Sequence, residues 1–338
     1  MKYALLDHNH SSLSKVNYGD HIQSLAAEQF LPKVDYYIER DRLNFFSGDY
    51  AKIIMNGWFT HEPNNWPPCS KLVPLFISFH LTPNIADAFL SNRNNLSYLK
   101  EYAPIGCRDY STLDIMRRYG IESYFSGCLT LTLDIKYRKE EKTDQVYFVD
   151  ILYRYDKDYL YNLGLKKILF NQMKLNRPFK NIASLKKRIL IDKLIPKEIQ
   201  NQACYITHLC ENSISGIDKY ALARRSLDLY AKAKLVLTSR IHCALPCLAL
   251  GTPVFFLLDG LEGKIGNLSR YKGLLEHLNL LTLTSEKEIK KTFGHSMNVF
   301  HPYDIDWDNP PKNPDSFNVI SSELKKNCYL FVEDKYRK

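Results

Sequence analysis

The chain lacks any long hydrophobic run. None of its apolar stretches approaches the roughly 20 residues that a helix needs to span a bilayer. The first residues, MKYALLDHNH, become polar after Leu6, so they do not have the pattern of a signal peptide. From these two absences we expect a protein that does not span a membrane and that stays in the cytoplasm.

Closely paired cysteines are also missing. The chain has eight cysteines, but no two of them have the C-x-x-C spacing. That scatter favours neither a zinc site nor a disulfide framework, and several cysteines lie beside Leu, Ile and Ala, as small buried hydrophobic residues do. We therefore expect no zinc site, and the sequence gives no indication of a cofactor.

The sequence contains no internal repeat, no low-complexity tract and no nucleic-acid-binding signature. Hydrophobic residues make up 45% of the chain and charged residues 25%, which is typical of a soluble globular protein. We expect no nucleic acid partner, and nothing in the sequence indicates an oligomeric state.

The charge is unbalanced, with 46 basic and 37 acidic residues and a net charge of +9. Such an excess suits an anionic membrane surface or a negatively charged small substrate. Part of it lies in one stretch with few acids, made up of Lys166, Lys167, Lys174, Arg177, Lys180, Lys186, Lys187, Arg188 and Lys193. This stretch is interpreted either as a solvated helical face, which its amphipathic leucine and isoleucine pattern favours, or as a contact with membrane or lipid-linked phosphates.

Short apolar strands alternate with helical patterns along the chain, which predicts an α/β fold with doubly wound parallel sheets. The charged segment 134–144 has no apolar periodicity and is the predicted linker between two domains, each with its own core. The predicted units are residues 1–138, residues 139–315 and a C-terminal helix within 316–338 that packs back on the first domain. We expect residues 299–313, rich in Pro and Asn, to form a surface connection.

The most informative segment is Lys234–Phe256, which reads KLVLTSRIHCALPCLALGTPVFF. It predicts a strand, a helix and a second strand, and it places Arg240 and His242 where the first strand becomes the helix. In an open parallel sheet this is the crevice that binds ligands. An arginine, a histidine and a helix start together suit an anion. The alternative interpretation is that Arg240 caps a neighbouring helix and His242 is a core polar group.

The chain resembles the polysaccharide pyruvyl transferase family in three segments. They are Asn17-Tyr18-Gly19-Asp20 with Gln23, then PIGCRD (104–109) leading to SGCLTLTL (126–133), and TSRIH (238–242) with Gly251-Thr252-Pro253. The resemblance implies a glycosyltransferase-B-like fold, in which two Rossmann-like domains face each other across a cleft.

The resemblance also implies an activity, the transfer of pyruvate from phosphoenolpyruvate to a sugar of a cell-surface polysaccharide such as an exopolysaccharide or capsule. The product is a cyclic ketal and no metal is required. The acceptor is a sugar, free or lipid-linked, and in the second case the protein is peripheral at the inner face of the membrane. Two alternatives remain open: a glycosyltransferase that uses a nucleotide sugar, and a glycan-binding module without turnover.

Donor-binding and catalytic roles follow from this resemblance. The expected donor-binding residues are Arg240, Ile241, His242, Ser239, His208 and, facing them from the first domain, Arg108. For His208, packing against the adjacent loop is an equal alternative. A protonated His242 is the expected general acid. Asp20 is the first candidate for the general base, with a helix-start charge or cap as the alternative.

The acceptor is expected to bind to the first domain, at Asn17, Asp20, His80 and Trp58. We expect Asn56 and Gly57 to form a turn that presents Trp58 from a loop, and Gly19 to supply a tight turn. For His80, packing against an adjacent loop is an equal alternative. Asp109 is expected to cap a helix or to orient Arg108.

Overall fold

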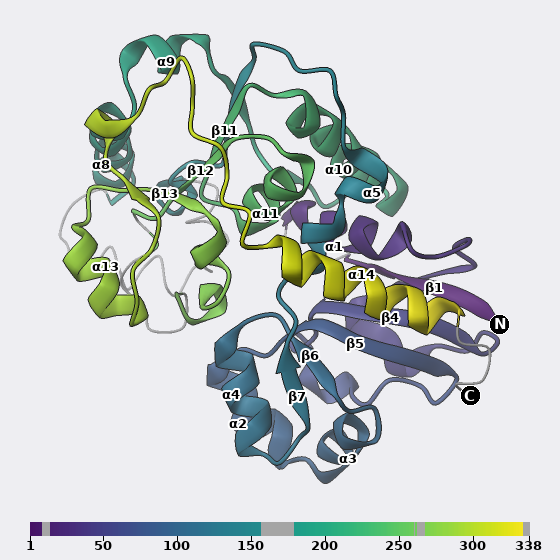
Figure 1. The fold of residues 1–338 in the computed structure, drawn as a ribbon. Helices are drawn as coiled ribbons and strands as arrows, with labels where there is room; N and C mark the ends of the chain where they lie inside the picture. The colour runs from purple at the N-terminus through teal and green to yellow at the C-terminus, as the bar shows by residue number, and fades with distance from the viewer. Residues whose placement is uncertain (9–13, 157–178, 260, 262–267, 334–338) are drawn as a thin grey trace.

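The computed structural model describes residues 1–8, 14–156, 179–259, 261 and 268–333. Two six-stranded sheets, parallel throughout, organise the chain, with helices packed around them (Figure 1). The predicted α/β class with parallel sheets is confirmed. The domain boundaries near residues 138 and 315 stay predictions.

The first sheet has the strand order β3-β1-β4-β5-β6-β7. Its strands are β1 (Lys2–Asp7), β3 (Tyr36–Glu39), β4 (Ala51–Trp58), β5 (Leu72–His80), β6 (Ile105–Cys107) and β7 (Ser123–Phe125). The chain moves outward from β1 to β3 in one direction and from β4 to β7 in the other. The carboxyl ends of β1 and β4 therefore flank a crevice, because their connections leave in opposite directions.

The second sheet has the order β14-β13-β12-β11-β8-β9. Its strands are β8 (Val146–Val149), β9 (Cys204–Ile206), β11 (Leu235–Thr238), β12 (Val254–Leu257), β13 (Asn279–Leu281) and β14 (Val299–Phe300). The order reverses between β8 and β11, so the corresponding crevice lies at their carboxyl ends. Because β14 is an edge strand, the prediction that residues 299–313 only form a surface connection is wrong at its start.

The α-helices pack around the two sheets. They are α1 (Gly19–Glu28), α2 (Pro83–Ser91), α3 (Arg93–Glu101), α4 (Tyr110–Arg118), α5 (Asp134–Tyr137), α8 (Phe179–Leu194), α9 (Lys197–Gln202), α10 (Gly216–Lys232), α11 (Ile241–Leu250), α13 (Glu286–Phe293) and α14 (Asn318–Glu333). The predicted linker 134–144 therefore begins with a helical turn, α5. Residues 166–178 of the basic stretch lie outside the described residues, and α8 carries the rest.

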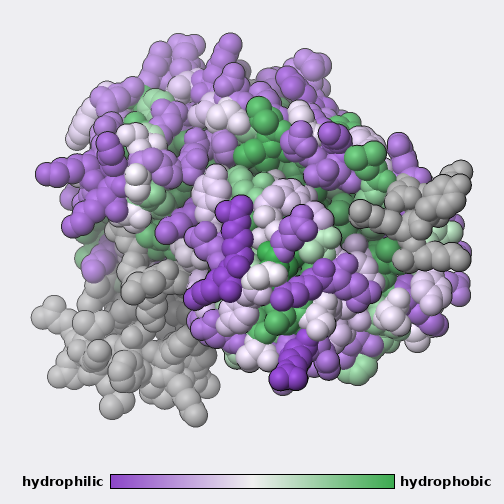
Figure 2. Space-filling model, turned by 60° about the horizontal axis from the view of Figure 1, so that its bottom comes forward, coloured by the Kyte–Doolittle hydropathy of each residue, from purple (hydrophilic) through white to green (hydrophobic). Residues whose placement is uncertain are grey.

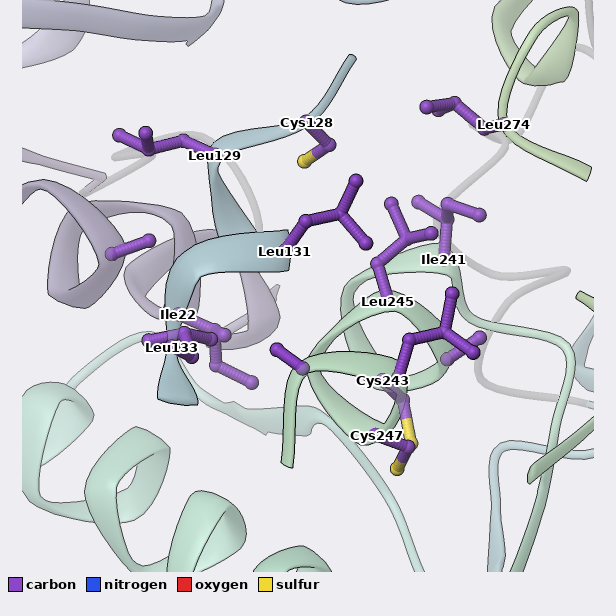
Figure 3. Packing of buried hydrophobic residues seen from close by; sticks show 14 of the residues in the cluster. Ile22, Cys128, Leu129, Leu131, Leu133, Ile241, Cys243, Leu245, Cys247 and Leu274 are labelled. Carbon is purple, nitrogen blue, oxygen red and sulfur yellow. The ribbon is translucent and has the colours of Figure 1, made fainter. Parts of the chain in front are cut away.

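Each half of the molecule has a buried hydrophobic cluster of its own, and a further cluster runs through both halves. A single buried cluster contains Leu5 and Ile22 from the first half and Leu227, Val236 and Leu245 from the second. In Figure 3 the segment around Leu131 lies against α11, with Ile241 and Leu245 close by. The two sheets are thereby held in a fixed relation around the pocket that they share.

A small antiparallel sheet also joins the halves. Strand β2 (Lys15–Asn17) pairs with β10 (Leu209–Glu211), and the Tyr18 N–H donates to the His208 carbonyl at 2.9 Å. The sequence does not predict this sheet, because three-residue strands in polar surroundings carry no clear alternation of apolar and polar residues. The pairing places the start of α1 beside the second half.

The C-terminal helix α14 packs back on the first sheet, beside β4 and β5 (Figure 1). The Lys52 ammonium donates to the Phe331 carbonyl at 2.6 Å, and the Ser321 hydroxyl donates to the Leu131 carbonyl at 2.9 Å. A helix is thus present within 316–338, and it lies against the first half.

On the face shown in Figure 2, the described residues are mostly hydrophilic, and hydrophobic ones form small separate patches. Among the described residues, no helix combines the length and the apolar character needed to cross a bilayer.

Candidate active site

A pocket of about 490 Å³ lies between the carboxyl ends of the two sheets. It is lined from the first half by Asn17, Asp20, Gln23, Arg40, Trp58, Thr60, His61, His80, Thr82, Asn84, Ile85 and Arg108, and from the second by Tyr153, His208, Ser239, Arg240, Ile241, His242, Arg270 and Tyr271. Every site residue predicted from the sequence is in this lining. The structure thus brings the predicted donor and acceptor residues into one space.

Arg240 is fixed at the crevice of the second sheet. Its backbone N–H donates to the Thr238 hydroxyl at 2.9 Å, and its Nε–H donates to Asp150 Oδ2 at 2.9 Å. Its Cζ lies 3.8 Å from the centre of the Tyr153 ring, a cation–π contact. Asp150 follows β8 and Arg240 follows β11, so the ion pair crosses the point where the strand order reverses.

The backbone that carries Asp150 and Tyr153 is strained. Asp150 has a φ of 46° and Leu152 a φ of 51°, in the left-handed region that residues with a Cβ seldom adopt. Hydrogen bonds hold this geometry: the Asp150 N–H donates to the Ile206 carbonyl at 3.0 Å, and the Leu152 N–H donates to the Ser239 hydroxyl at 3.0 Å. Strain of this kind, held by its surroundings, clusters at functional sites.

His242 and Asp20 face each other across the two halves. His242 Nδ1 lies 3.6 Å from Asp20 Oδ1, and among the described residues nothing hydrogen-bonds His242 Nε2, which is buried. Burial raises the pKa of Asp20, but the contact with His242 and the charges of His8, His242 and Arg40 outweigh it and hold that pKa well below its ordinary value. Asp20 is therefore a carboxylate at neutral pH, suited to balancing a charged imidazole.

The first sheet contributes His80, Asp109 and Arg108 to the opposite wall. His80 Nδ1 lies 2.6 Å from Asp109 Oδ2, and Arg108 Nε lies 3.8 Å from the same oxygen. Burial and the Arg108 charge lower the pKa of His80 to about 4, against the opposing effect of Asp109. A neutral His80 donates its Nδ1–H to Asp109, which leaves Nε2 as a hydrogen-bond acceptor.

Asp109 also caps α4, as the sequence predicts, because its Oδ1 accepts the Thr112 N–H at 2.9 Å. The carboxylate therefore serves the helix, the histidine and the arginine together.

Ser239 and Ile241 are two further residues that the sequence predicts on the donor side. Ser239 is fully buried, and its hydroxyl accepts the Leu152 N–H and donates to the Leu257 carbonyl at 3.1 Å, so it ties strands together at the pocket edge. Ile241 forms a buried apolar part of the wall at the start of α11.

The His208 ring is fully buried and turned toward the core, with Nε2 2.6 Å from the Tyr230 hydroxyl. Its Nδ1 would lie 2.5 Å from a Cβ placed on Gly19. The predicted tight turn at Gly19 is wrong, since Gly19 is the first residue of α1. A glycine is needed there because the His208 ring approaches the backbone closely.

On the acceptor side, the Asn17 side chain accepts the Gly19 N–H at 3.1 Å and shapes the start of α1. The predicted loop and turn before Trp58 are wrong, because β4 continues through Asn56 and Gly57 to Trp58. A register shift at Met55 and Gly57, with a φ of 138° at Gly57, redirects the strand end. Among the described residues the buried indole N–H of Trp58 has no partner.

Arg40 and Arg270 were not predicted. Arg40 follows β3, so its position at a strand's carboxyl end could have identified it. It lies over Trp58, with Cζ 5.4 Å from the ring centre. Arg270 lies in the short 3₁₀ helix η5 (Ser269–Tyr271), and no pattern in the sequence marks it.

The family model for polysaccharide pyruvyl transferases matches residues 17–258. The chain belongs to this family. Membership makes the protein a transferase, and it implies a pyruvate donor and a polysaccharide acceptor. Arg240, His242, Arg108, His80 and Asp20 all lie inside the matched residues.

No curated protein matches the chain at a significant level. Among solved structures, the chain is similar to a crystal structure of a functional uncharacterized protein from Klebsiella pneumoniae subsp. pneumoniae NTUH-K2044, with 13% identity over 84% of this chain and 93% of that one and a TM-score of 0.45. Similarity at this level carries no argument here.

Proposed function

We propose that the protein transfers pyruvate from phosphoenolpyruvate to a sugar of a cell-surface polysaccharide, or of its precursor, and forms a cyclic ketal. The observation that carries the proposal is the convergence of four arginines and the His242–Asp20 pair on one pocket between the sheets. The arginines are Arg40, Arg108, Arg240 and Arg270.

Phosphoenolpyruvate fits the charge of this pocket. Its carboxylate and phosphate need cationic partners on more than one side, and arginines provide forked donors for both groups. Arg108 and Arg240 come from different sheets, so a donor between them is held from two directions. Both guanidinium groups are oriented by carboxylates, Asp109 and Asp150.

The proposed reaction begins with protonation of the donor. Protonated His242 gives its proton to the enol carbon C3, and the positive charge that develops at C2 is attacked by a sugar hydroxyl. The proton of that hydroxyl returns to the His242–Asp20 pair. A second hydroxyl then attacks C2 as the bond from C2 to the phosphate oxygen breaks, and its proton leaves with the phosphate.

In this scheme Asp20 acts with His242 rather than as a separate base. Its lowered pKa makes the carboxylate a weak proton acceptor by itself but a good counter-charge for the imidazolium. The two hydroxyl protons end on C3 and on the released phosphate, so the reaction balances without a cofactor or metal.

The first-half wall is the proposed acceptor side. Trp58 offers a ring and an indole N–H, His80 offers its Nε2, and Asn17 lies at the start of α1. A pocket of about 490 Å³ lies within the range of roughly 300–1,000 Å³ that holds substantial organic ligands, so donor and sugar have room together.

We also propose a glycosyltransferase-B-like arrangement with the boundaries 1–138, 139–315 and 316–338. A pocket at the carboxyl ends of both parallel sheets supports it.

Contact with an anionic membrane carrying a lipid-linked acceptor is a related proposal. The exposed side of α8 supports it, because Lys186, Arg188 and Lys193 lie there with the exposed apolar Leu185 and Ile189.

A ligand panel tests the donor. Phosphoenolpyruvate should raise the melting temperature of the protein and nucleotide sugars should not, and phosphate release should require a glycan acceptor. Stabilisation by a nucleotide sugar alone would instead indicate the glycosyltransferase alternative. Tight glycan binding without phosphate release under any condition would indicate a binding module.

A further inference from the structure

Arg270 reaches the pocket from a segment beyond the family-matched residues, which end at 258. The 3₁₀ helix η5 lies between β12 and β13 in the chain, yet it contacts the first half. The Tyr110 N–H donates to the Lys272 carbonyl at 3.2 Å. Gly273 has a φ of 88°, and a Cβ there would lie 2.7 Å from the Phe125 ring. The segment is thus seated tightly against α4 and β7, and Arg270 lies where the halves meet.

The arginines of the pocket differ in how their charges are balanced. Arg40 Nη2 lies 3.0 Å from Asp41 Oδ2, Arg108 Nε lies 3.8 Å from Asp109 Oδ2, and Arg240 Nε lies 2.9 Å from Asp150 Oδ2. Among the described residues no carboxylate oxygen lies within ion-pair distance of Arg270, whereas the other three arginines each have one. The buried Nε of Arg270, like that of Arg108, has no hydrogen-bond partner there. Against the effect of burial, Asp20 and Asp109 act on Arg270 from a greater distance and help to raise its pKa. A largely buried guanidinium without a directly paired carboxylate can be stabilised further by an anionic ligand.

Arg270 also lies close to other basic residues of the pocket. Its own guanidinium lies 5.2 Å from the centre of the Tyr271 ring. The Arg270 charge contributes, after burial, to lowering the pKa of both Arg108 and His80, so these cations lie close enough to repel one another. Like charges held together in a pocket are stabilised by an anion between them.

We infer that Arg270 binds the phosphate group of the donor and thereby sets the requirement for a dianionic phosphate monoester. The inference rests on the proposed function, and it assigns the most charged group of the donor to the arginine that has no ion pair among the described residues. The arginines that are already paired with an aspartate suit the carboxylate group of phosphoenolpyruvate, which carries a single negative charge. The charge requirement of the donor site is then set by a segment outside the family-matched residues.

The test compares Arg270→Gln and Arg270→Lys with wild type in equilibrium binding of phosphoenolpyruvate, inorganic phosphate and pyruvate. We expect Arg270→Gln to weaken binding of phosphoenolpyruvate and phosphate by about 10- to 100-fold, the effect of losing charge-assisted hydrogen bonds. Pyruvate binding should change less than about twofold, and Arg270→Lys should fall between. The control is Arg225→Gln, a change at an exposed arginine of α10, which should leave all three affinities unaltered.

The outcomes separate the two proposals. If wild type binds phosphoenolpyruvate and Arg270→Gln, shown to be folded by its melting curve, binds it equally well, the role of Arg270 is overturned and the proposed function stands. If wild type does not bind phosphoenolpyruvate, the proposed donor is wrong, and the phosphate measurement alone decides the role of Arg270. An equal loss of pyruvate and phosphate binding would place Arg270 at the carboxylate and overturn the assignment.

Discussion

The two walls of the pocket are built from the same three residue types but use them differently. The first-sheet wall has Arg108, Asp109 and His80, and the second-sheet wall has Arg240, Asp150 and His208. In each case an aspartate orients an arginine and also accepts a hydrogen bond from the histidine residue. Asp109 accepts from the His80 ring, whereas Asp150 accepts the backbone N–H of His208 at 2.9 Å.

The difference decides which imidazole reaches a substrate. His80 continues β5 to its carboxyl end, and its ring lies at the pocket with Nδ1 held by Asp109. His208 sits in the turn between β9 and β10, and its ring is directed to the Tyr230 hydroxyl in the core. On the second wall the histidine at the reacting centre is instead His242, from α11. A histidine that follows a strand is therefore expected near the crevice, but the local backbone decides whether its ring faces the pocket.

The largest effect should come from His242, the proposed acid of the second wall. His242→Gln should lower kcat by about 10²- to 10⁴-fold, the usual contribution of a general acid, with little change in phosphoenolpyruvate binding. The measurement is steady-state phosphate release together with direct donor binding. His80→Gln is the matched control on the first wall, and it should affect mainly the KM for the acceptor. Similar kcat losses in both variants would contradict the proposal that the second wall supplies the acid and the first wall binds the acceptor.

Arg240→Gln should have the next largest effect, because it removes a charged donor from the reacting centre. We expect kcat to fall by about 10²- to 10³-fold. The change also leaves Asp150 buried without its cation, which should cost on the order of 3–5 kcal/mol in the free energy of unfolding. The double variant Asp150→Asn with Arg240→Gln should recover much of the stability and none of the activity. Recovery of activity would contradict a donor-binding role for Arg240.

The sheets and most helices could be predicted from the sequence because their apolar periodicities are strong and local. Strand β11 and helix α11 lie in the order predicted for Lys234–Phe256, and the Asp109 cap is as predicted. The shared core and the β2–β10 pairing could not be predicted. Both depend on contacts between segments far apart in the chain, and periodicity shows that a face is buried without showing what it packs against.

The same limit applied to the site. Arg240 and His242 were identifiable because a strand, a helix start and two ionisable residues coincide within a few positions. Arg270 was not, because it lies in an irregular segment and only tertiary packing against Tyr110 and Phe125 brings it to the pocket. Burial likewise had to be seen before the Ser239 hydroxyl and the His208 ring could be assigned to structural contacts.

Acidification should destabilise both walls through their buried imidazoles. The pKa values of His80 and His208 are lowered to about 4, chiefly by burial, while an unfolded histidine titrates near 6.5. The unfolded chain therefore binds more protons between these values, so the stability is complete above pH 6.5 and is lost as the pH falls toward 4. Each imidazole contributes on the order of 3 kcal/mol to this loss.

Urea unfolding at pH 7.5 and pH 4.5 measures this dependence. His80→Gln and His208→Gln should each be less sensitive to acid than wild type over this interval. A wild-type pH dependence in both variants would show that these rings are not the groups responsible.

A smaller effect is expected at Gly19, where the first half meets the His208 ring. Gly19→Ala places a Cβ 2.5 Å from His208 Nδ1 and 2.9 Å from Asn17 Oδ1. We expect a loss of about 1–3 kcal/mol in the free energy of unfolding, the cost of overpacking. The control is Gly294→Ala, where no atom lies within 4 Å of the added Cβ and only the positive φ of 89° opposes the change. Equal losses at the two glycines would mean that the ring contact has no cost of its own.

The smallest effect should come from Trp58, which tests the first wall as the acceptor side. Trp58→Phe keeps an aromatic ring but removes the indole N–H, which has no partner among the described residues and is free to donate to a sugar oxygen. Loss of one such hydrogen bond should raise the KM for the acceptor by about 2- to 10-fold and leave the KM for phosphoenolpyruvate unchanged. Trp66→Phe is the matched control, because the Trp66 N–H donates to the Phe59 carbonyl at 3.0 Å inside the core. That variant should lose stability without a change in the KM for the acceptor. If Trp66→Phe raised the KM for the acceptor and Trp58→Phe did not, the acceptor would not bind at this wall.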